Sequence, residues 1–140
     1  MDWERYSELT ALADSGRAEE ALGGLSELGR ACTDPVEKTI ALMATADCLV
    51  MLGRSEEARQ PVREAYTVLG EDSEFYPRLA FKDASIDMAL GNWKQALTKI
   101  DAILDKYSSV LGCCENGDLL DHLRRSRGIL RGSDYCRWWN

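Results

Sequence analysis

The chain has few residues of several types, and it lacks the long apolar segments of membrane proteins and secreted proteins. Its 140 residues include one histidine, three prolines and two phenylalanines. No apolar run approaches the roughly 20 residues that a membrane-spanning helix needs. The first residues, MDWERYSELT, lack the apolar segment of a secretory signal. We therefore expect a protein of the cytoplasm that has no membrane partner.

Motifs for catalysis are missing as well. The chain contains neither GxxxxGKS/T nor a strand-initiated GxGxxG, the glycine-rich loops that hold phosphate groups. The single histidine, His122, offers little for acid–base chemistry. The glutamate pairs Glu19/Glu20 and Glu56/Glu57 fall at expected helix starts, where carboxylates offset the positive end of the helix dipole. We expect no enzymatic activity, no catalytic residue and no cofactor.

Acidic residues dominate most of the chain. The net charge is −7, but residues 1–118 hold 12 basic and 22 acidic side chains. Residues 119–140 reverse the balance, with five arginines against the two aspartates Asp121 and Asp134. The arginines are Arg124, Arg125, Arg127, Arg131 and Arg137. Because nucleic-acid binding draws on clustered Lys and Arg, the acidic body argues against a nucleic-acid partner. We interpret the arginine patch as the solvated face of a last helix.

The cysteines suggest thiols rather than a framework of bonds. Five is an odd number, and reduced thiols are normal in the cytosol. Cys32 and Cys48 fall in helical stretches, where we expect small buried hydrophobes. One set of residues has the composition of a zinc site: Cys113, Cys114, His122 and Cys136. Its spacing is unlike that of zinc fingers and no CxxC occurs, so we expect no metal.

A repeat is the strongest signal in the sequence. The stretches LADSGRAEEAL (12–22), LVMLGRSEEAR (49–59) and DMALGNWKQAL (87–97) align, with Gly16, Gly53 and Gly91 separated by 37 and 38 residues. An alanine follows each glycine five residues later: Ala21, Ala58 and Ala96. We predict that each Gly ends a helix in the left-handed conformation, and that each Ala sits where two antiparallel helices cross.

The repeat and the helix signals predict seven helices and no strand. Six form the pairs 2–14 and 17–30, 35–52 and 55–69, and 74–90 and 92–108. Asp34 and Pro35 form an N-cap and first helical position, Pro77 lies in a first turn, and Pro61 predicts a kink or a late helix start. After a break at 112–118, Asp118 is expected to cap a seventh helix with one apolar face: Leu119, Leu120, Leu123 and Leu130.

The sequences GRAEEAL, GRSEEAR and GNWKQAL resemble the tetratricopeptide repeat family, whose unit is a helix–turn–helix of 34 residues. Trp93 occupies a position where the family often has an aromatic residue, and small Ala46 and Ala84 stand at the close-packing position of the first helices. The repeats here are three or four residues longer, and the first has Leu9 at the small position. The resemblance implies three repeats over 1–111 and a right-handed superhelix. The residues that follow predict a loop and capping helix over 112–132 and an irregular tail over 133–140.

The resemblance also implies a concave groove formed by the first helix of each repeat. Family positions transferred by their phase to the glycine give these groove residues: Trp3, Tyr6, Thr10, Ala13, Asp14, Ile40, Met43, Asp47, Val50, Met51, Arg78, Phe81, Ser85, Met88 and Ala89. Ten of them are the predicted partner-binding set: Trp3, Tyr6, Ile40, Met43, Asp47, Met51, Arg78, Phe81, Ser85 and Met88. Methionine is flexible and polarisable and suits surfaces that accept a helix or an apolar segment. The same residues also fit ordinary core, since apolar helical faces usually pack inward.

Three functions follow from this set. The first is a non-catalytic adaptor that binds a protein or peptide in the groove. The second is a homo-oligomerisation module, in which the groove or the tail with Trp138 and Trp139 associates with a second copy to make a homodimer. The third is a regulator that binds a small molecule or lipid among Trp3, Met43, Met51 and Phe81.

Overall fold

The computed structural model describes the backbone of residues 1–111 and 117–132, and the side chains of 1–107 and 118–132. These residues form seven α-helices and no strand: α1 (Trp3–Asp14), α2 (Ala18–Ala31), α3 (Pro35–Met51), α4 (Arg59–Val68), α5 (Tyr76–Ala89), α6 (Trp93–Leu111) and α7 (Gly117–Gly132). The prediction of an all-helical chain is confirmed. Residues 112–116 and the tail 133–140, with Cys113, Cys114 and Cys136, lie outside the described residues.

The repeated glycines end their helices as predicted. Gly16, Gly53 and Gly91 have φ angles of +95°, +74° and +79°, a region that side chains with a Cβ rarely adopt. At the first turn the Gly16 N–H donates to the Ala13 carbonyl at 3.0 Å and the Arg17 N–H to the Leu12 carbonyl at 3.1 Å. This pair of bonds is the Schellman motif, which satisfies the last carbonyls of a helix. The same two bonds recur at the other two glycines.

Helix starts follow the proline signals. Asp34 caps α3, since its carboxylate accepts a hydrogen bond from the Glu37 N–H at 3.0 Å, and Pro35 is the first helical residue. Pro77 is the second residue of α5. Of the two alternatives predicted at Pro61, a kink or a late start, the structure shows the late start: α4 begins at Arg59, and the predicted bounds 55–69 are corrected. Residues 55–58 form turns in which bonds such as Arg59 N–H to the Glu56 carbonyl span three residues.

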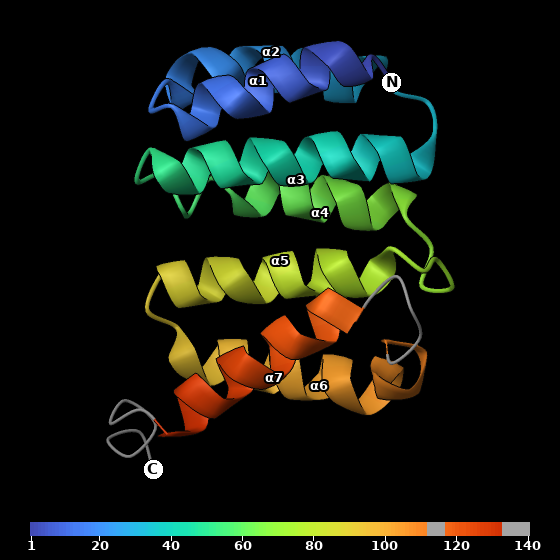
Figure 1. Cartoon of the computed structure of the whole chain (residues 1–140), viewed down its shortest axis with the longest axis vertical. Coiled ribbons are helices and arrows are strands. Elements are labelled where there is room, and N and C mark those ends of the chain that lie inside the picture. The colour runs from blue at the N-terminus through green and yellow to red at the C-terminus, as the bar shows by residue number, and fades with distance from the viewer. Residues whose placement is uncertain (112–116, 133–140) are drawn as a thin grey trace. The chain divides into compact units, whose positions relative to one another are not determined.

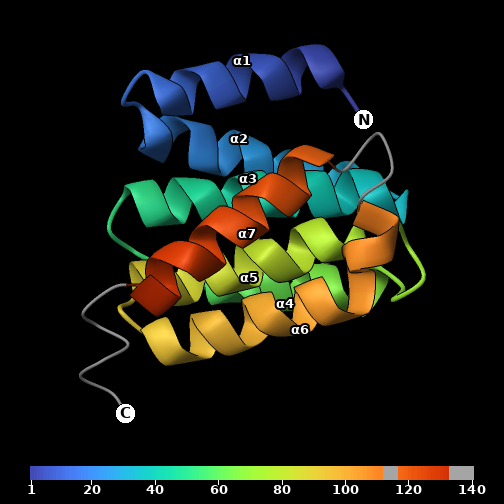
Figure 2. The same ribbon diagram turned by 60° about the horizontal axis from the view of Figure 1, so that its bottom comes forward.

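The chain divides into two compact units, Met1–Leu79 and Ala80–Asn140. In the first unit α1 and α2 form an antiparallel pair, α3 and α4 form a second, and α2 packs on α3 (Figure 2). Successive helices run in opposite directions, so α1 and α3 run the same way (Figure 1). The predicted crossing residues Ala21 and Ala58 are completely buried here.

Leu9 and Gly24 explain how the first pair departs from the repeat. Leu9 is buried at the position where the next repeats have Ala46 and Ala84, both completely buried. A Cβ added to Gly24 on α2 would lie 2.6 Å from Leu9 Cδ2. The larger side chain on α1 is therefore accommodated by the absence of one on α2, which keeps the interface closely packed.

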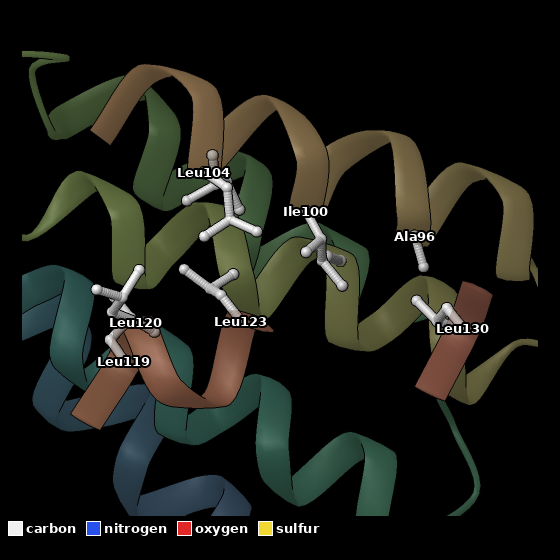
Figure 3. Close-up of a cluster of buried hydrophobic side chains, with 9 residues drawn as sticks. Ala96, Ile100, Leu104, Leu119, Leu120, Leu123 and Leu130 are labelled. Atoms are coloured by element: carbon white, nitrogen blue, oxygen red, sulfur yellow. The ribbon is translucent and has the colours of Figure 1, made fainter. Parts of the chain in front are cut away.

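The second unit contains the rest of α5 with α6 and α7. One face of α7 packs on α6 through Leu119, Leu120, Leu123 and Leu130, all 8% exposed or less. Figure 3 shows Leu123 pointing toward Leu104 of α6, with Ile100 and Ala96 further along that helix. Arg131 on α7 also donates to both carboxylate oxygens of Asp101 at 3.1 Å. The predicted apolar face of the last helix is confirmed. The N-cap assignment is corrected: α7 begins at Gly117, so Asp118 lies in its first turn.

An ion cluster lies between α5 and α6. Lys99 Nζ is 2.5 Å from Asp87 Oδ2 and 3.3 Å from Asp83 Oδ1, and the Asp87 side chain is 2% exposed. By phase to the glycine, Asp87 corresponds to Leu12 and Leu49, and Lys99 corresponds to Gly24 and Pro61. The third helix pair therefore has a buried carboxylate and its counter-ion where the first two have apolar or small residues.

A search of the described helices for long apolar segments finds none that could cross a membrane.

Candidate functional site

A pocket of about 180 Å³ opens between α1 and α3 in the first unit. Both helices contribute to it at helical spacing, so one face of each is involved. The lining residues are Tyr6, Thr10, Ala13 and Asp14 of α1, Leu25 of α2, and Ala44, Asp47, Cys48 and Met51 of α3. Leu25, Ala44 and Cys48 are buried, whereas Met51 is 54% exposed. The pocket thus has an apolar base that belongs to the core and a rim that reaches solvent.

One face of α1 and one face of α3 lie on either side of the pocket. Because α1 and α3 run the same way (Figure 1), their successive turns lie in the same order along the pocket. On each helix, side chains three or four residues apart lie on the same face, so they can reach the space between the two helices. Leu25 enters this space from α2, the helix that packs against both.

Two carboxylates, those of Asp14 and Asp47, belong to the pocket lining. Burial raises the pKa of the Tyr6 hydroxyl, and the charge of Asp47 raises it further. Burial likewise raises the pKa of the Cys48 thiol, with smaller effects of Asp47 and Asp14 in the same direction. Both shifts indicate that an additional negative charge is disfavoured at the base of the pocket. Cys48 therefore stays a protonated thiol at neutral pH and is a poor nucleophile.

Aromatic and thioether groups border the same site. The rings of Trp3 and Tyr6 meet edge to face, with centroids 5.7 Å apart and an interplanar angle of 82°. Trp3 is 47% exposed, and with Met51 it is among the exposed large apolar side chains of the described residues. Contiguous exposed apolar patches, rather than single side chains, are typical of surfaces that contact a partner.

The ten predicted groove residues divide between the two units. Tyr6, Asp47 and Met51 line the pocket, and Trp3 contacts Tyr6. Ile40 and Met43 are half-buried on α3 but do not belong to the described lining. The remaining residues come from α5, where Arg78 belongs to the first unit and Phe81, Ser85 and Met88 belong to the second.

The residues from the second unit have local packing roles. Phe81 and Met88 pack against the buried cluster that α6 and α7 share. The Ser85 hydroxyl donates to the Phe81 carbonyl of its own helix at 2.9 Å. Phe81 and Met88 therefore contribute to the core of their unit, whereas Ser85 bonds to the backbone of its own helix.

Three lining residues were absent from the groove positions inferred from the sequence. Ala44 and Cys48 share a helical face with Asp47 and Met51, and this spacing could have revealed them. Leu25 comes from a second helix, and no pattern in the sequence connects it to α1 and α3. Thr10, Ala13 and Asp14 were among the wider set of groove positions.

The described lining of the pocket holds few groups that commonly act in acid–base or nucleophilic chemistry. Histidine is absent from the described pocket lining, and the lining thiol is held protonated. Within residues 1–111 and 117–132, no three His, Cys, Asp or Glu side chains are grouped so that they could hold a metal ion. The lining combines two carboxylates, a phenol and a thioether with buried apolar side chains.

Comparison with protein-family models, with curated proteins and with solved structures finds no match to this chain.

Proposed function

We propose that the chain is a tetratricopeptide-like helical repeat protein of the cytoplasm that binds another protein without catalysis. The proposal rests on one observation, the solvent-open pocket between the first helices of the first two repeats. In a repeat fold of this kind the first helices form the binding surface, and the three Schellman turns and buried crossing alanines support such a repeat. The helices provide a rigid frame, so partner binding would require little ordering of this surface.

The exposed side chains beside the pocket fit this function better than a purely structural role. Trp3 and Met51 are about half exposed, although both are large and apolar. Burying them against a partner would remove apolar surface from water, which favours association by about 25 cal/mol per Å². Aromatic residues and methionine are also enriched in protein interfaces.

A site-specific crosslinking experiment tests the proposal. A photoreactive amino acid replaces Met51, which borders the pocket, and in a control chain it replaces Ile129 on α7, which is 64% exposed. We expect a partner protein to crosslink from position 51 and not from position 129. The purified partner should then bind the wild-type chain and lose at least about tenfold in affinity to Met51→Glu, which places a charge in an apolar contact.

Other outcomes identify the alternatives. A crosslinked product of two copies of this chain would replace the adaptor proposal with self-association. Equal crosslinking from both positions, or a partner that binds Met51→Glu as tightly as wild type, would show that the α1–α3 surface is not the binding site.

A further inference from the structure

Helix α7 carries a cluster of arginines that lack a counter-ion. Arg124, Arg125 and Arg127 lie close together in the chain; the first two are exposed and Arg127 is half-buried. Within residues 1–111 and 117–132, no carboxylate pairs with any of the three. The chain has 24 acidic side chains, so a shortage of carboxylates does not explain why these guanidinium groups are left without one.

Arg131 shows what one side of α7 binds. Its guanidinium donates to both carboxylate oxygens of Asp101 on α6 at 3.1 Å. Arg124 and Arg127 precede it by seven and four residues, a spacing that places the three side chains along one side of the helix. We call these three residues the arginine side of α7. It binds one carboxylate through Arg131 and continues into two guanidinium groups that bind none.

The stability of α7 does not account for the two remaining arginines. A basic side chain offsets the negative end of the helix dipole only in the last turn, where α7 has Arg131. Arg124 and Arg127 lie before that turn, and like charges one turn apart destabilise a helix. Four buried leucines hold α7 on α6 instead. A local cost of this kind is expected at functional sites.

The residue type points to a carboxylate ligand. The helix sequence GDLLDHLRRSRGILRG contains four arginines and no lysine, whereas residues 1–118 contain seven arginines and five lysines. A guanidinium presents two parallel N–H donors that match the two oxygens of a carboxylate, and an ammonium is only a point charge. The contact between Arg131 and Asp101 has this two-bond form.

The charge of the rest of the chain limits the partner to a short acidic segment. The net charge is −7, and residues 1–79 contain 16 acidic and 8 basic side chains. A long polyanion such as nucleic acid, or a surface of anionic lipids, would be repelled by this excess and would need more clustered cations than α7 provides. A protein segment with two carboxylates needs to contact only the arginine side of α7.

We infer that α7 binds an acidic segment of a protein, with Arg124 and Arg127 each holding one carboxylate as Arg131 holds Asp101. Side chains one helical turn apart have Cβ atoms about 5–6 Å apart, so a matching segment is a helix with two acidic residues three or four positions apart. This surface belongs to the second unit and does not depend on the pocket between α1 and α3.

Selection of short random peptides displayed on phage tests the inference with the whole chain as bait. We expect the peptides that prefer the wild type to an Arg124→Gln, Arg127→Gln chain to share two acidic residues three or four positions apart. In a synthetic peptide, replacing either acidic residue by its amide should weaken binding about fivefold, because a well-aligned exposed ion pair contributes about 1 kcal/mol. Fluorescence anisotropy of the labelled peptide measures this.

Two further variants provide the matched comparison. Arg30→Gln with Arg63→Gln removes the same charge from two exposed arginines of the first unit and should leave binding unchanged. Arg124→Lys with Arg127→Lys keeps the charge but removes the parallel donors, and should bind the peptide more weakly than wild type. If the glutamine variant does not fold by circular dichroism, the lysine variant takes its place in the selection.

Each other outcome overturns the inference. Selected peptides without paired acidic residues, or no peptide that distinguishes the wild type from the variants of α7, would remove the carboxylate site. An equal loss in the control variant would reduce the effect to net charge. A DNA oligonucleotide that binds more tightly than the peptides, and only to wild-type α7, would make the partner a nucleic acid. A dimer in sedimentation that the glutamine variant dissociates would make it a second copy of this chain.

Discussion

The two units use the same turn and the same buried alanine, yet they differ in charge and in how their helices fit together. Residues 1–79 carry 16 acidic and 8 basic side chains, whereas residues 80–140 carry 8 and 9. In the first unit an apolar contact, Leu9 on Gly24, adjusts the fit of a helix pair. In the second unit the corresponding faces hold Asp87 and Lys99, which pair as ions. The repeat therefore specifies the backbone frame and leaves the chemistry of each interface open.

The two units also differ in which of their helix faces are open to solvent. The first unit has a pocket that is open to solvent and carries carboxylates on its lining. In the second unit α7 covers α6 with four buried leucines (Figure 3). A helix pair too short to bury its own apolar face needs a neighbour, and α7 meets that need for α6. The units thus differ in what covers a helix face: the face of α6 is buried by α7, whereas the pocket between α1 and α3 is open to solvent.

The largest effect is expected where the first unit depends on an apolar fit. Leu9→Ala should lower the free energy of unfolding by about 2–5 kcal/mol, because it removes a buried side chain and leaves a cavity. Urea denaturation followed by circular dichroism measures this. Gly24→Ala should destabilise the wild type by crowding Leu9, but it should stabilise the Leu9→Ala chain, since alanine favours helix over glycine. Equal effects of Gly24→Ala in both backgrounds would contradict the proposed fit between α1 and α2.

The second-largest loss of stability is expected at the ion cluster of the second unit. Lys99→Met should cost about 1–3 kcal/mol, because it removes a cation that neutralises the buried Asp87 carboxylate. Asp87→Leu combined with Lys99→Met restores the apolar pattern of the other repeats and should recover most of that loss. Hydrogen exchange of α5 and α6 amides gives the local stability. A double variant no more stable than Lys99→Met would show that the two residues are not coupled.

A smaller effect is expected at the contact between α6 and α7. Arg131→Ala removes the two bonds to Asp101, but the Arg131 side chain is 58% exposed, and exposed ion pairs contribute about 0.2–1 kcal/mol. The loss should diminish in high salt, because salt screens exposed charges. A thermal melt in low and high salt tests this. A loss of several kcal/mol would mean that α7 depends on this pair more than on its leucines.

The smallest effect is a loss of stability at alkaline pH that depends on the Cys48 thiol. Since the fold raises the pKa of the Cys48 thiol above its ordinary value of 9.0, the unfolded chain releases this proton at a lower pH than the folded chain does. Stability from this residue is therefore fully present below pH 9.0 and is lost as the pH rises through the folded pKa. Cys48→Ala should lose less stability than wild type over that alkaline range. Parallel losses in the two chains would contradict the raised pKa.

Local signals in the sequence predicted local structure well. The glycines at 16, 53 and 91 have positive φ and Asp34 caps its helix, since each depends on a few neighbouring residues. The helix ends were less accurate: α4 starts at Arg59 instead of residue 55, and Asp118 lies inside α7. Bonds that span three or four residues compete at such ends, and sequence alone does not decide between them.

The sequence by itself determined the repeat, the positions of its turns and the apolar faces of its helices, because these depend on backbone conformation and on periodicity along one chain segment. Only the tertiary structure decided which faces meet. Leu25 reaches the pocket from a different helix, and Cys48 lies at its base although it reads as ordinary core. Asp87 is buried because Lys99, on the next helix, neutralises it. Contacts between helices depend on their rotation and packing, which are set by many side chains at once.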